Sequence, residues 1–493
     1  MSLRGRLLAV VAAGLAVACT VGPDYVKPST LETPAYKEPP PDSFTAAGVW
    51  KRAQPSDRLL RSKWWEVFGD PELNALEEQV SVANQNLKIA AARFRQARAL
   101  VGFSRAAEFP TIGVSPQIDS LKESLNKPYV TATHTTGDFV LPLDASYEVD
   151  LWGRVARTVN AAGEEAQATA ADLETASLSL HAELAIDYFD LRSADSLAKL
   201  LNDSVKYYAD ALQLTENRAE GGAAPESDVA QAKTLLDTTR VQATDITVQR
   251  AQFEHAIAVL IGKPPAAFGL PASPLALRQP FVPVGIPSEL LQRRPDIAAA
   301  ERRVAEANEQ IGIAEAAYYP SLYLNGSIGF EGTTVANWFN WPSLFWAVGA
   351  TMSETLFDGG RRNATSKAAL AAYDATVAAY RQTTLAAFQE VEDNLAALRI
   401  LEQEAQQQAA AVASAKRSLE LSNSRYVGGR DTYLQVIVAE TVALSNEINE
   451  TQILRRRMEA SVLLIKALGG GWDTADLPKL EDLKRAGDHD DKK

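Results

Sequence analysis

The second half of this 493-residue chain repeats the order of motifs found in its first half. Arg154 follows Leu-Trp-Gly, and Arg361, 207 residues later, follows Phe-Asp-Gly-Gly. The same spacing separates three more matches: Arg192 from Arg399, Arg218 from Arg425, and Gly221-Gly222 from Gly428-Gly429. Such self-similarity indicates two copies of one structural unit. Each unit is expected to run helix, strand, loop, strand, long helix, Gly-Gly break and helix.

Each unit contains one stretch that predicts an unusually long helix. The stretch 154–219 has no proline and one glycine, and 361–427 has neither. About 65 residues at roughly 1.5 Å each give a helix of about 100 Å, far longer than a compact domain. A seven-residue spacing predicts a coiled-coil seam in the second stretch. The seam residues are Val377, Thr384, Val391, Leu398, Ala405, Val412 and Leu419.

Four shorter segments alternate apolar and polar residues, as strands do. They are residues 110–119, 139–150, 321–331 and 344–356. An ordinary half-buried sheet and a transmembrane barrel both produce this pattern. For a barrel, four strands are too few, because the smallest membrane barrels need eight and an open edge leaves backbone groups unpaired in lipid. Two, three or four copies would permit closure, and three are favoured because twelve strands leave a lumen.

The N-terminus predicts an exported lipoprotein. Residues 1–18 carry Arg4 and Arg6 before an apolar run, as a secretory signal peptide does. The run is too short to cross a bilayer as a helix, and no other segment has about 20 apolar residues. Cys19, the single cysteine, follows Ala-Val-Ala, which favours cleavage before Cys19 and its acylation. The alternative is an ordinary signal-peptidase site beside an unmodified cysteine.

Charge and histidine content bear on the class of protein. Removing the leader changes the formal net charge from -13 to -15, which disfavours nucleic acid as a partner. The four histidines are scattered, and no nucleotide-binding, metalloprotease or serine-hydrolase motif is present. The sequence therefore predicts no enzyme, no metal and no cofactor apart from the covalent lipid on Cys19.

Acidic residues fall on the polar side of the second strand. They are Asp144, Glu148 and Asp150. In a threefold assembly they would line the lumen with negative charge and favour cations, whereas the alternative is a solvated acidic face. Trp338, Phe339 and Trp341 lie between the third and fourth strands. They suit an aromatic girdle at a membrane interface, with a hydrophobic minicore under a loop as the alternative.

Three motifs carry a resemblance to a known family. They are Cys-Thr-Val-Gly-Pro-Asp-Tyr at 19–25, Trp64-Trp65 followed by Phe-Gly-Asp-Pro-Glu-Leu at 68–73, and Arg-Arg-Pro-Asp-Ile at 293–297. With the repeat, they make the chain resemble the TolC-like outer-membrane efflux factors, in the lipid-anchored branch that works with resistance-nodulation-division pumps. The resemblance covers the chain from Cys19 to about Leu468.

The resemblance implies an α+β fold and a homotrimer. Its parts would be a twelve-stranded transmembrane β-barrel with four strands per protomer, a long α-helical coiled-coil barrel in the periplasm, and a mixed equatorial domain. Residues 76–262 would form the first repeat, ending in a helix at 226–262, and residues 288–468 the second, ending in a helix at 431–468. The segments 19–75, 263–287 and 469–493 would build the equatorial domain.

The implied function is a passive exit duct in the outer membrane. The implied partners are outer-membrane lipid, a periplasmic adaptor and an inner-membrane pump. Asp228, Arg430 and Tyr426 match the positions that tether the closed periplasmic tip in relatives, with simple helix-capping charges as the alternative. Leu434 matches an apolar constriction, and Val438 stands where relatives usually place a pore-facing Asp. A hydrophobic constriction is therefore expected.

A periplasmic coiled-coil adaptor or structural lipoprotein is the rival interpretation. Such a protein would share the leader and the long helices. It would not need four alternating strands at matching places in both halves of the chain.

Overall fold

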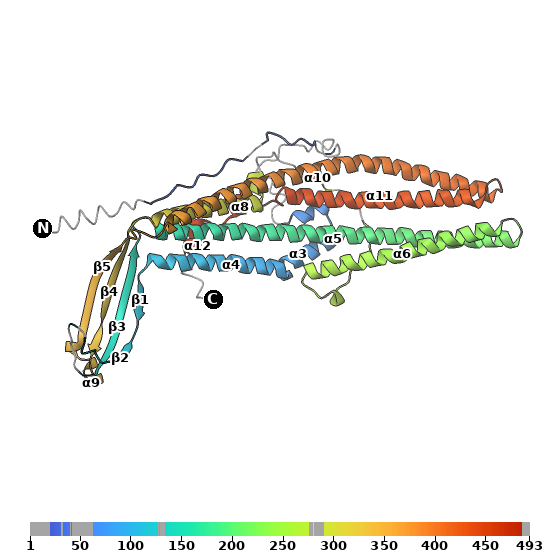
Figure 1. Ribbon diagram of the computed structural model, residues 1–493. Coiled ribbons are helices and arrows are strands. Elements are labelled where there is room, and N and C mark those ends of the chain that lie inside the picture. The colour runs from blue at the N-terminus through green and yellow to red at the C-terminus, as the bar shows by residue number, and fades with distance from the viewer. Residues whose placement is uncertain are drawn as a thin grey trace.

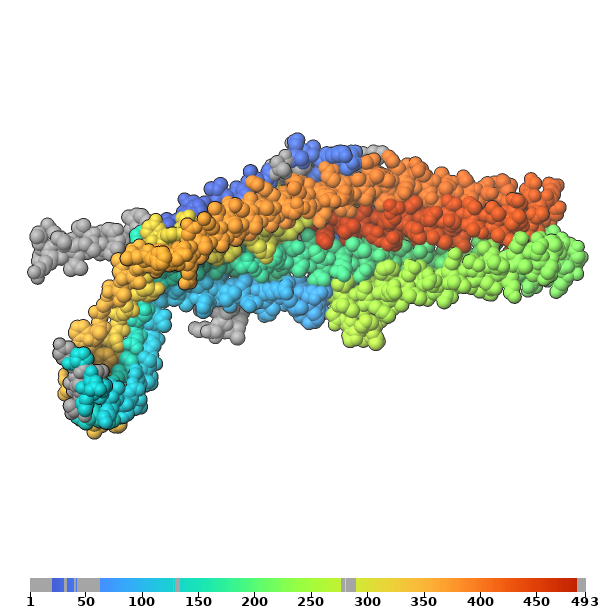
Figure 2. Space-filling model, in the orientation of Figure 1, coloured from blue at the N-terminus to red at the C-terminus, as the bar shows by residue number. Residues whose placement is uncertain are grey.

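The computed structural model describes residues 20–30, 33–39, 41, 63–126, 128, 134–275, 280 and 290–485. The molecule is elongated, with a sheet at one end and the tips of two helical hairpins at the other (Figure 1). The sheet is set at an angle to the helical body, so the molecule is bent where the two meet (Figure 2).

Two helices of equal length dominate the body. They are α5 (Arg154–Glu220) and α10 (Arg361–Val427), each 67 residues long, which corresponds to about 100 Å at 1.5 Å per residue. Each is followed by a returning helix of 35 residues, α6 (Glu226–Leu260) and α11 (Tyr433–Ala467). Gly222 and Gly429 have φ of 71° and 69° in the two tip turns, a conformation that glycine adopts at little cost.

The remaining helical elements are shorter. They are η2 (Trp64–Phe68), α3 (Pro71–Ala83), α4 (Gln85–Arg105), η3 (Ala106–Glu108), η4 (Pro265–Ala267), α7 (Leu290–Arg293), α8 (Pro295–Ala316), α9 (Val335–Trp338), η6 (Trp341–Ser343), η7 (Thr474–Asp476) and α12 (Leu480–Arg485).

The helices are arranged as a layer in the same order along the whole body. In the half near the sheet, α8 lies between α5 and α10, and α4 packs on α5. In the half near the tips, α11 lies between α5 and α10, and α6 packs on α5 (Figure 1). Helix α5 is therefore inside the layer, while α10 forms one edge and α4 with α6 forms the other.

A glycine joins the two halves of each repeat at mid-height. Gly262 and Gly469, 207 residues apart, follow α6 and α11 and have φ of 71° and 89°. A side chain on Gly262 would overlap the backbone of Ala83, and one on Gly469 would overlap the backbone of Arg293. Because neither glycine has a side chain, the helix that returns from the tip can end close to the start of the next helix, which runs toward the sheet. These helix pairs are α6 with α4 and α11 with α8.

The strands form one antiparallel sheet. They are β1 (Thr111–Val114), β2 (Gln117–Leu121), β3 (Thr136–Val149), β4 (Ser321–Gly332) and β5 (Leu344–Ser353). The order is β1-β3-β4-β5, with β2 also paired to β3. Leu143 pairs with Ile328, and Ile328 pairs with Trp346. This register puts most apolar residues of the strands on one face and most polar residues on the other, where Val140 and Phe345 are exceptions.

The strand predicted at about 139–150 begins earlier, as β3 at Thr136, and two other strands differ from the expected ranges because of proline. The strand predicted at 110–119 is split into β1 and β2 around Ser115 and Pro116, because proline has no amide hydrogen for the ladder. The strand predicted at 344–356 ends at Ser353, whose partner Ser321 is preceded by Pro320. The hydrogen-bond ladder therefore ends at Pro320, which has no amide hydrogen to donate.

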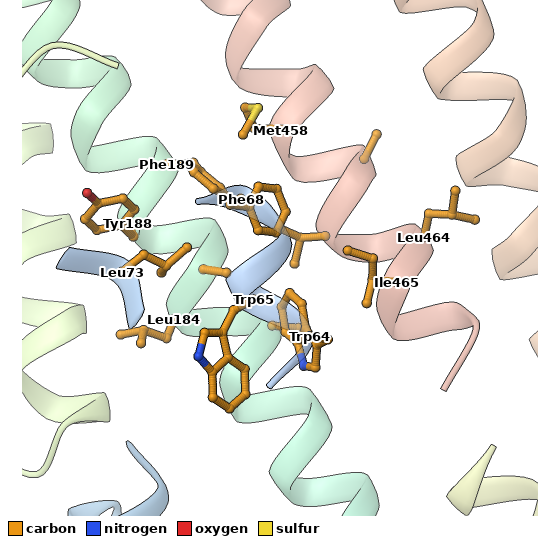
Figure 3. Packing of buried hydrophobic residues seen from close by; sticks show 14 of the residues in the cluster. Trp64, Trp65, Phe68, Leu73, Leu184, Tyr188, Phe189, Met458, Leu464 and Ile465 are labelled. Atoms are coloured by element: carbon orange, nitrogen blue, oxygen red, sulfur yellow. The ribbon is translucent and has the colours of Figure 1, made fainter. Parts of the chain in front are cut away.

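The largest hydrophobic core lies at mid-height, where η2 and α3 meet α5 and α11 (Figure 3). Trp64 and Trp65 are each 3% exposed there, and Leu184 and Leu464 are fully buried. Phe268 and Leu275 from the crossover between the repeats pack against the same cluster. The described parts of the N-terminal segment and the crossover thus meet around the middle of the helical layer.

Candidate functional site

The polar face of the sheet carries two of the three predicted acidic residues. Asp144 accepts hydrogen bonds from Ser115 Oγ at 3.2 Å and Ser327 Oγ at 2.7 Å. Glu148 accepts from Arg154 Nε at 2.9 Å and from the Tyr323 hydroxyl at 3.2 Å. The charge of Glu148 is thus balanced by Arg154, while Asp144 has only neutral partners among these bonds.

The third predicted acid has a different place. Asp150 follows the end of β3, and its Oδ2 accepts a hydrogen bond from the Ala156 amide at 2.8 Å. The first amides of a helix lack partners within the helix and attract a carboxylate. Asp150 therefore caps α5 rather than projecting from the strand.

Aromatic residues gather at the far end of the sheet. The Trp338 ring stacks on Phe339 at 4.8 Å and lies 5.5 Å from Phe139, and its Nε1 donates to the Phe330 carbonyl. Trp341 is 83% exposed and Trp346 is 72% exposed. Trp338 thus belongs to a small local core, as a hydrophobic minicore under the loop would require. Trp341 and Trp346 face outward, as an aromatic girdle at a membrane interface would require.

The described chain begins beside the junction of sheet and helices. Cys19 lies outside the described residues, but Val21 N donates to Trp152 O at 3.1 Å, and Trp152 Nε1 donates to Pro320 O at 2.8 Å. The Trp152 ring stacks on Tyr319 at 4.7 Å. Val21, the second residue after Cys19, is therefore held where β3 passes into α5 and where α8 leads into β4.

Residues 20–30 and 33–38 lie along both repeats as an extended strap. Arg157 and Asn308 both donate to the Pro23 carbonyl, and the Tyr25 hydroxyl donates to Glu301. Farther along, Glu38 forms an ion pair with Arg399 at 2.6 Å. The strap thus runs from the sheet junction toward mid-height.

At the tips, Tyr426 is part of a buried cluster. It is 4% exposed and packs with Ala232, Tyr433 and Val436. The Arg218 guanidinium lies 4.4 Å from the centre of the Tyr426 ring and donates to the Tyr426 carbonyl. Arg218 therefore joins the two hairpins, a role that the repeat alone did not reveal.

Asp228 and Arg430 do not meet each other within the described chain. Asp228 lies in the first turn of α6, and Arg430 is exposed in the turn between α10 and α11. The ion pair that this turn does contain joins Arg425 Nε to Asp431 Oδ2 at 2.6 Å. A tether through Asp228, Arg430 and Tyr426 stays a prediction about contacts between copies.

Leu434 and Val438 lie on an exposed apolar stripe of α11. Their exposed fractions are 48% and 51%, and Val442, one turn farther on, is 47% exposed. Spacing of four residues puts the three side chains on one face of the helix. The opposite face is buried through Tyr433, Val436 and Ala443.

Glu440 is a buried carboxyl group close to this stripe. It is 1% exposed, and neither carboxylate oxygen has a hydrogen-bond partner in the part of the chain that the structure describes. Burial raises the pKa of Glu440 to about 7. Glu440 is not among the predicted site residues, although it follows the buried Tyr433 by one heptad and so falls in the seam of α11.

Two absences concern the described residues. Within the described ranges, no helix combines the length and hydrophobicity needed to cross a membrane. Over the same part of the chain, no group of three or more His, Cys, Asp or Glu residues is placed to hold a metal ion.

Comparisons with known proteins agree with this architecture. Residues 76–263 and 286–470 match the family model described as outer membrane efflux protein. The pyoverdine export outer membrane protein OpmQ of Pseudomonas aeruginosa is 33% identical over 452 residues, which is 88% of this chain and 93% of OpmQ. The toluene efflux pump outer membrane protein TtgI of Pseudomonas putida is 30% identical over 460 residues, 93% of this chain and 96% of TtgI.

A solved structure of the outer-membrane channel OprN has the same fold. It superposes with a TM-score of 0.84 at 32% sequence identity. The match covers 92% of this chain and 100% of the OprN chain. The similarity therefore extends over the sheet, the helical layer and the middle of the molecule together.

Proposed function

This chain belongs to the outer membrane efflux protein family, and from that membership we propose that it is an outer-membrane exit channel made of three copies. The family consists of efflux proteins rather than enzymes. The observation that carries the proposal is the open sheet, whose edges are β1 with β2 on one side and β5 on the other. In lipid, each unpaired backbone group at such an edge costs several kcal/mol.

Three copies would close the sheet and give each face a suitable environment. The face that carries Val114, Ile328 and Val348 is exposed in the single chain and would contact lipid. The face with Asp144, Tyr323 and Ser327 would line the lumen. Twelve strands leave room for a water-filled passage, whereas eight would be filled by side chains.

The helical layer would close at the same two edges. Exposed apolar residues lie on both of them, including Ile400 and Leu421 on α10 and Phe103, Val241 and Val248 on α4 and α6. When α10 of one copy packs on α4 and α6 of the next, these residues are removed from water at about 25 cal/mol per Å². The same arrangement repeated three times gives a tube that continues the barrel.

A lipid on Cys19 would anchor this tube from outside the lumen. The residue after Cys19 is Thr20, which lies against Gly153 at the junction of sheet and helices. If the sheet occupies the membrane, this junction lies at the membrane surface, where an acyl chain attached one residue earlier reaches lipid. Mass spectrometry of the purified protein would test the modification, with an unmodified N-terminal cysteine as the contrary result.

The tip would hold the gate. We propose that Leu434 and Val438 face the axis and form a hydrophobic constriction, because their stripe on α11 is apolar, exposed and opposite the buried seam. Asp228 and Arg430 are proposed to hold neighbouring copies together in the closed state, while Tyr426, buried within its own copy, supports the tip between them. Docking of an adaptor would replace those contacts and let the tip helices separate.

The gate can be tested by conductance in planar bilayers. Val438→Asp would place three carboxylates at the constriction and should increase cation selectivity. Lys233→Asp, an exposed position on α6 of the other hairpin, provides a charge-changing control on the same tip. Unchanged selectivity in the Val438 variant would show that this residue does not face the pore.

The partners and cargo follow from the kind of duct proposed. A channel without an energy source needs a periplasmic adaptor and an inner-membrane pump to deliver its substrate. OpmQ and TtgI are named for different cargo, pyoverdine and toluene. We therefore propose a conduit whose cargo is selected by the pump.

Imaging of the full-length protein extracted in detergent tests the assembly. The expected result is a tube with threefold symmetry, well over about 100 Å long because the long helices alone span that distance. Single rods without a detergent belt would contradict the proposal and favour a periplasmic adaptor.

A further inference from the structure

A cavity of about 370 Å³ opens at mid-height, away from the sheet and the tips. It lies between α5, η2, the start of α8 and the loop that follows α11. Trp64, Trp65, Trp472 and His181 contribute to its walls. The proposed channel function uses none of these four side chains.

The walls are held rigidly. Trp64 and Trp65 are each 3% exposed, and the Trp65 ring stacks on His181 at 4.4 Å. The Nδ1 atom of His181 lies 2.6 Å from Glu77 Oε2, which is buried behind it. Trp472 packs on the Ala171, Ala298 and Ala299 cluster. The aromatic surfaces are thus already positioned without a ligand.

Glycine keeps one side of the cavity open. Gly469, Gly470 and Gly471 all have positive φ, from 59° to 89°. A side chain on Gly470 would overlap Leu178 Cδ1 and come within 3.3 Å of Trp64 Cδ1, both in residues of the wall. The loop therefore passes close to the tryptophans without filling the space between them.

The charge around the cavity is negative. Glu174 and Asp476 stand exposed at the rim, and neither has an ion-pair partner among the described residues. No lysine or arginine lines the cavity. Burial lowers the pKa of His181 to about 4, so its ring is neutral at pH 7 and adds no positive charge.

We propose that this cavity binds small organic ammonium ions. An ammonium group is attracted to the face of a tryptophan ring; Trp472 is the half-buried tryptophan of the wall, and the two rim carboxylates add a Coulomb attraction. The aliphatic part of the ligand would be enclosed by the indoles and Leu178. The proposal goes beyond the exit-channel function and does not depend on it, because binding needs neither an open gate nor a partner.

Choline and its uncharged isostere, 3,3-dimethylbutan-1-ol, separate charge from shape. Full-length protein in a maltoside detergent would be titrated with each, using calorimetry and tryptophan fluorescence. Choline should bind saturably, at least tenfold more tightly than the isostere, and more weakly as salt is added. Equal affinity for the two compounds would overturn the proposal.

Variants locate the site. Glu174→Gln with Asp476→Asn should reduce choline affinity at least tenfold, and both residues are exposed, so folding should be retained. Trp472→Leu should reduce it several-fold, while Trp472→Phe keeps an aromatic face and should retain most of it. Glu183→Gln, an exposed change on the same helix, is the matched control and should have no effect. Unchanged affinity in the double variant would show that choline binds elsewhere.

The affinity should also depend on pH. The Glu174 side chain is solvent-accessible, but the protein atoms around its carboxyl group displace part of its water, and this desolvation together with the nearby charge of Asp476 raises the pKa of Glu174. Acidification should therefore begin to weaken choline binding above the pH range in which an ordinary glutamate protonates. A pH profile that is the same in Glu174→Gln as in the native protein would contradict this assignment.

Discussion

Helices α5 and α10 have the same length and matching positions in the two repeats, yet they are buried very differently. Helix α5 buries 26 of its 67 residues, and α10 buries ten of its 67. The cause is position, because α5 has helices on both sides and α10 has α8 and α11 on one side. In a repeated architecture, such a difference between equivalent helices identifies the side on which a neighbouring copy is needed.

The same contrast holds for the returning helices. Glu440 of α11 and Lys233 of α6 are 207 residues apart in equivalent places, but Glu440 is buried and Lys233 is exposed. Helix α11 lies inside the layer, and α6 forms its edge. The returning helices of the two repeats are thus equivalent in sequence order but differ in position, because α11 is inside the layer and α6 is at its edge.

The largest expected effect concerns the mid-height core, where equivalent residues of α5 and α10 are equally buried. Leu191 and Leu398 are equivalent, and each is fully buried in the mid-height core. Replacing either with alanine should lower the free energy of unfolding by about 2–5 kcal/mol, from lost burial and the cavity left behind. Denaturant unfolding would measure both variants. A much smaller loss for Leu398→Ala would mean that α10 is loosely packed even in the core.

The next effect compares a titratable residue inside the layer, Glu440, with its equivalent at the edge, Lys233. The pKa of Glu440 is about 7 in the folded chain, above the ordinary value near 4.3. The folded state therefore holds its proton more tightly, so Glu440 costs stability as pH rises from about 4 to about 7. Glu440→Gln should remove that loss, stabilising the protein by roughly 3 kcal/mol at pH 8 and not at pH 4.

Lys233→Gln provides the edge control for that prediction. Because Lys233 is exposed, its replacement should change the free energy of unfolding by less than about 0.5 kcal/mol at either pH. Thermal melts across pH 4–8 would compare the two variants. A pH dependence that survives in Glu440→Gln would assign the titration to another group.

A smaller effect per copy tests the free edge itself. Leu421 on α10 is 48% exposed, and its equivalent Leu214 on α5 is 44% exposed. Leu421 is nine residues after the buried Val412, which places it on the opposite side of the helix, toward the missing neighbour. Leu421→Glu should weaken the trimer by roughly 2 kcal/mol per copy through a buried unpaired charge.

Leu214→Glu is the matched control for the edge. Helix α5 has neighbours on both sides, so Leu214 points off a face of the layer and its change should leave the trimer intact. Native mass spectrometry or light scattering of the detergent-solubilised variants would report the number of copies. Dissociation caused equally by both variants would break the inference that α10 forms the interface.

Much of the architecture was predictable because local patterns determined it. The absence of proline from residues 361–427 predicted a helix of the length that α10 has, and the heptad from Val377 to Leu419 contains only buried or half-buried residues. The alternation in four segments predicted strands, and the observed register combines their apolar sides on one face. In both cases the period of the sequence is the period of the structure.

The details that escaped prediction depend on partners that are distant in the sequence. Asp150 fits the strand alternation, but the free amides of α5 recruit it as a cap. Tyr426 fits an exposed tether, but Tyr433 and Arg218 enclose it. The cavity beside Trp65 needs a loop more than 400 residues away in the chain. Such features follow from which elements meet, and a single sequence does not show that.

The order of the strands has a consequence for how the chain folds. The hairpin of α5 and α6 joins neighbouring segments and can form as soon as they are exported, but β3 pairs with β4, so that Leu143 must find Ile328 from the other repeat. Pairing over such a separation is slow compared with local helix formation. Until the second repeat arrives, β3 is paired only with β1 and β2 and its other edge stays open, and such exposed strands are prone to aggregate. The protein should therefore need a periplasmic holding chaperone most while its first half is complete and its second half is still being delivered.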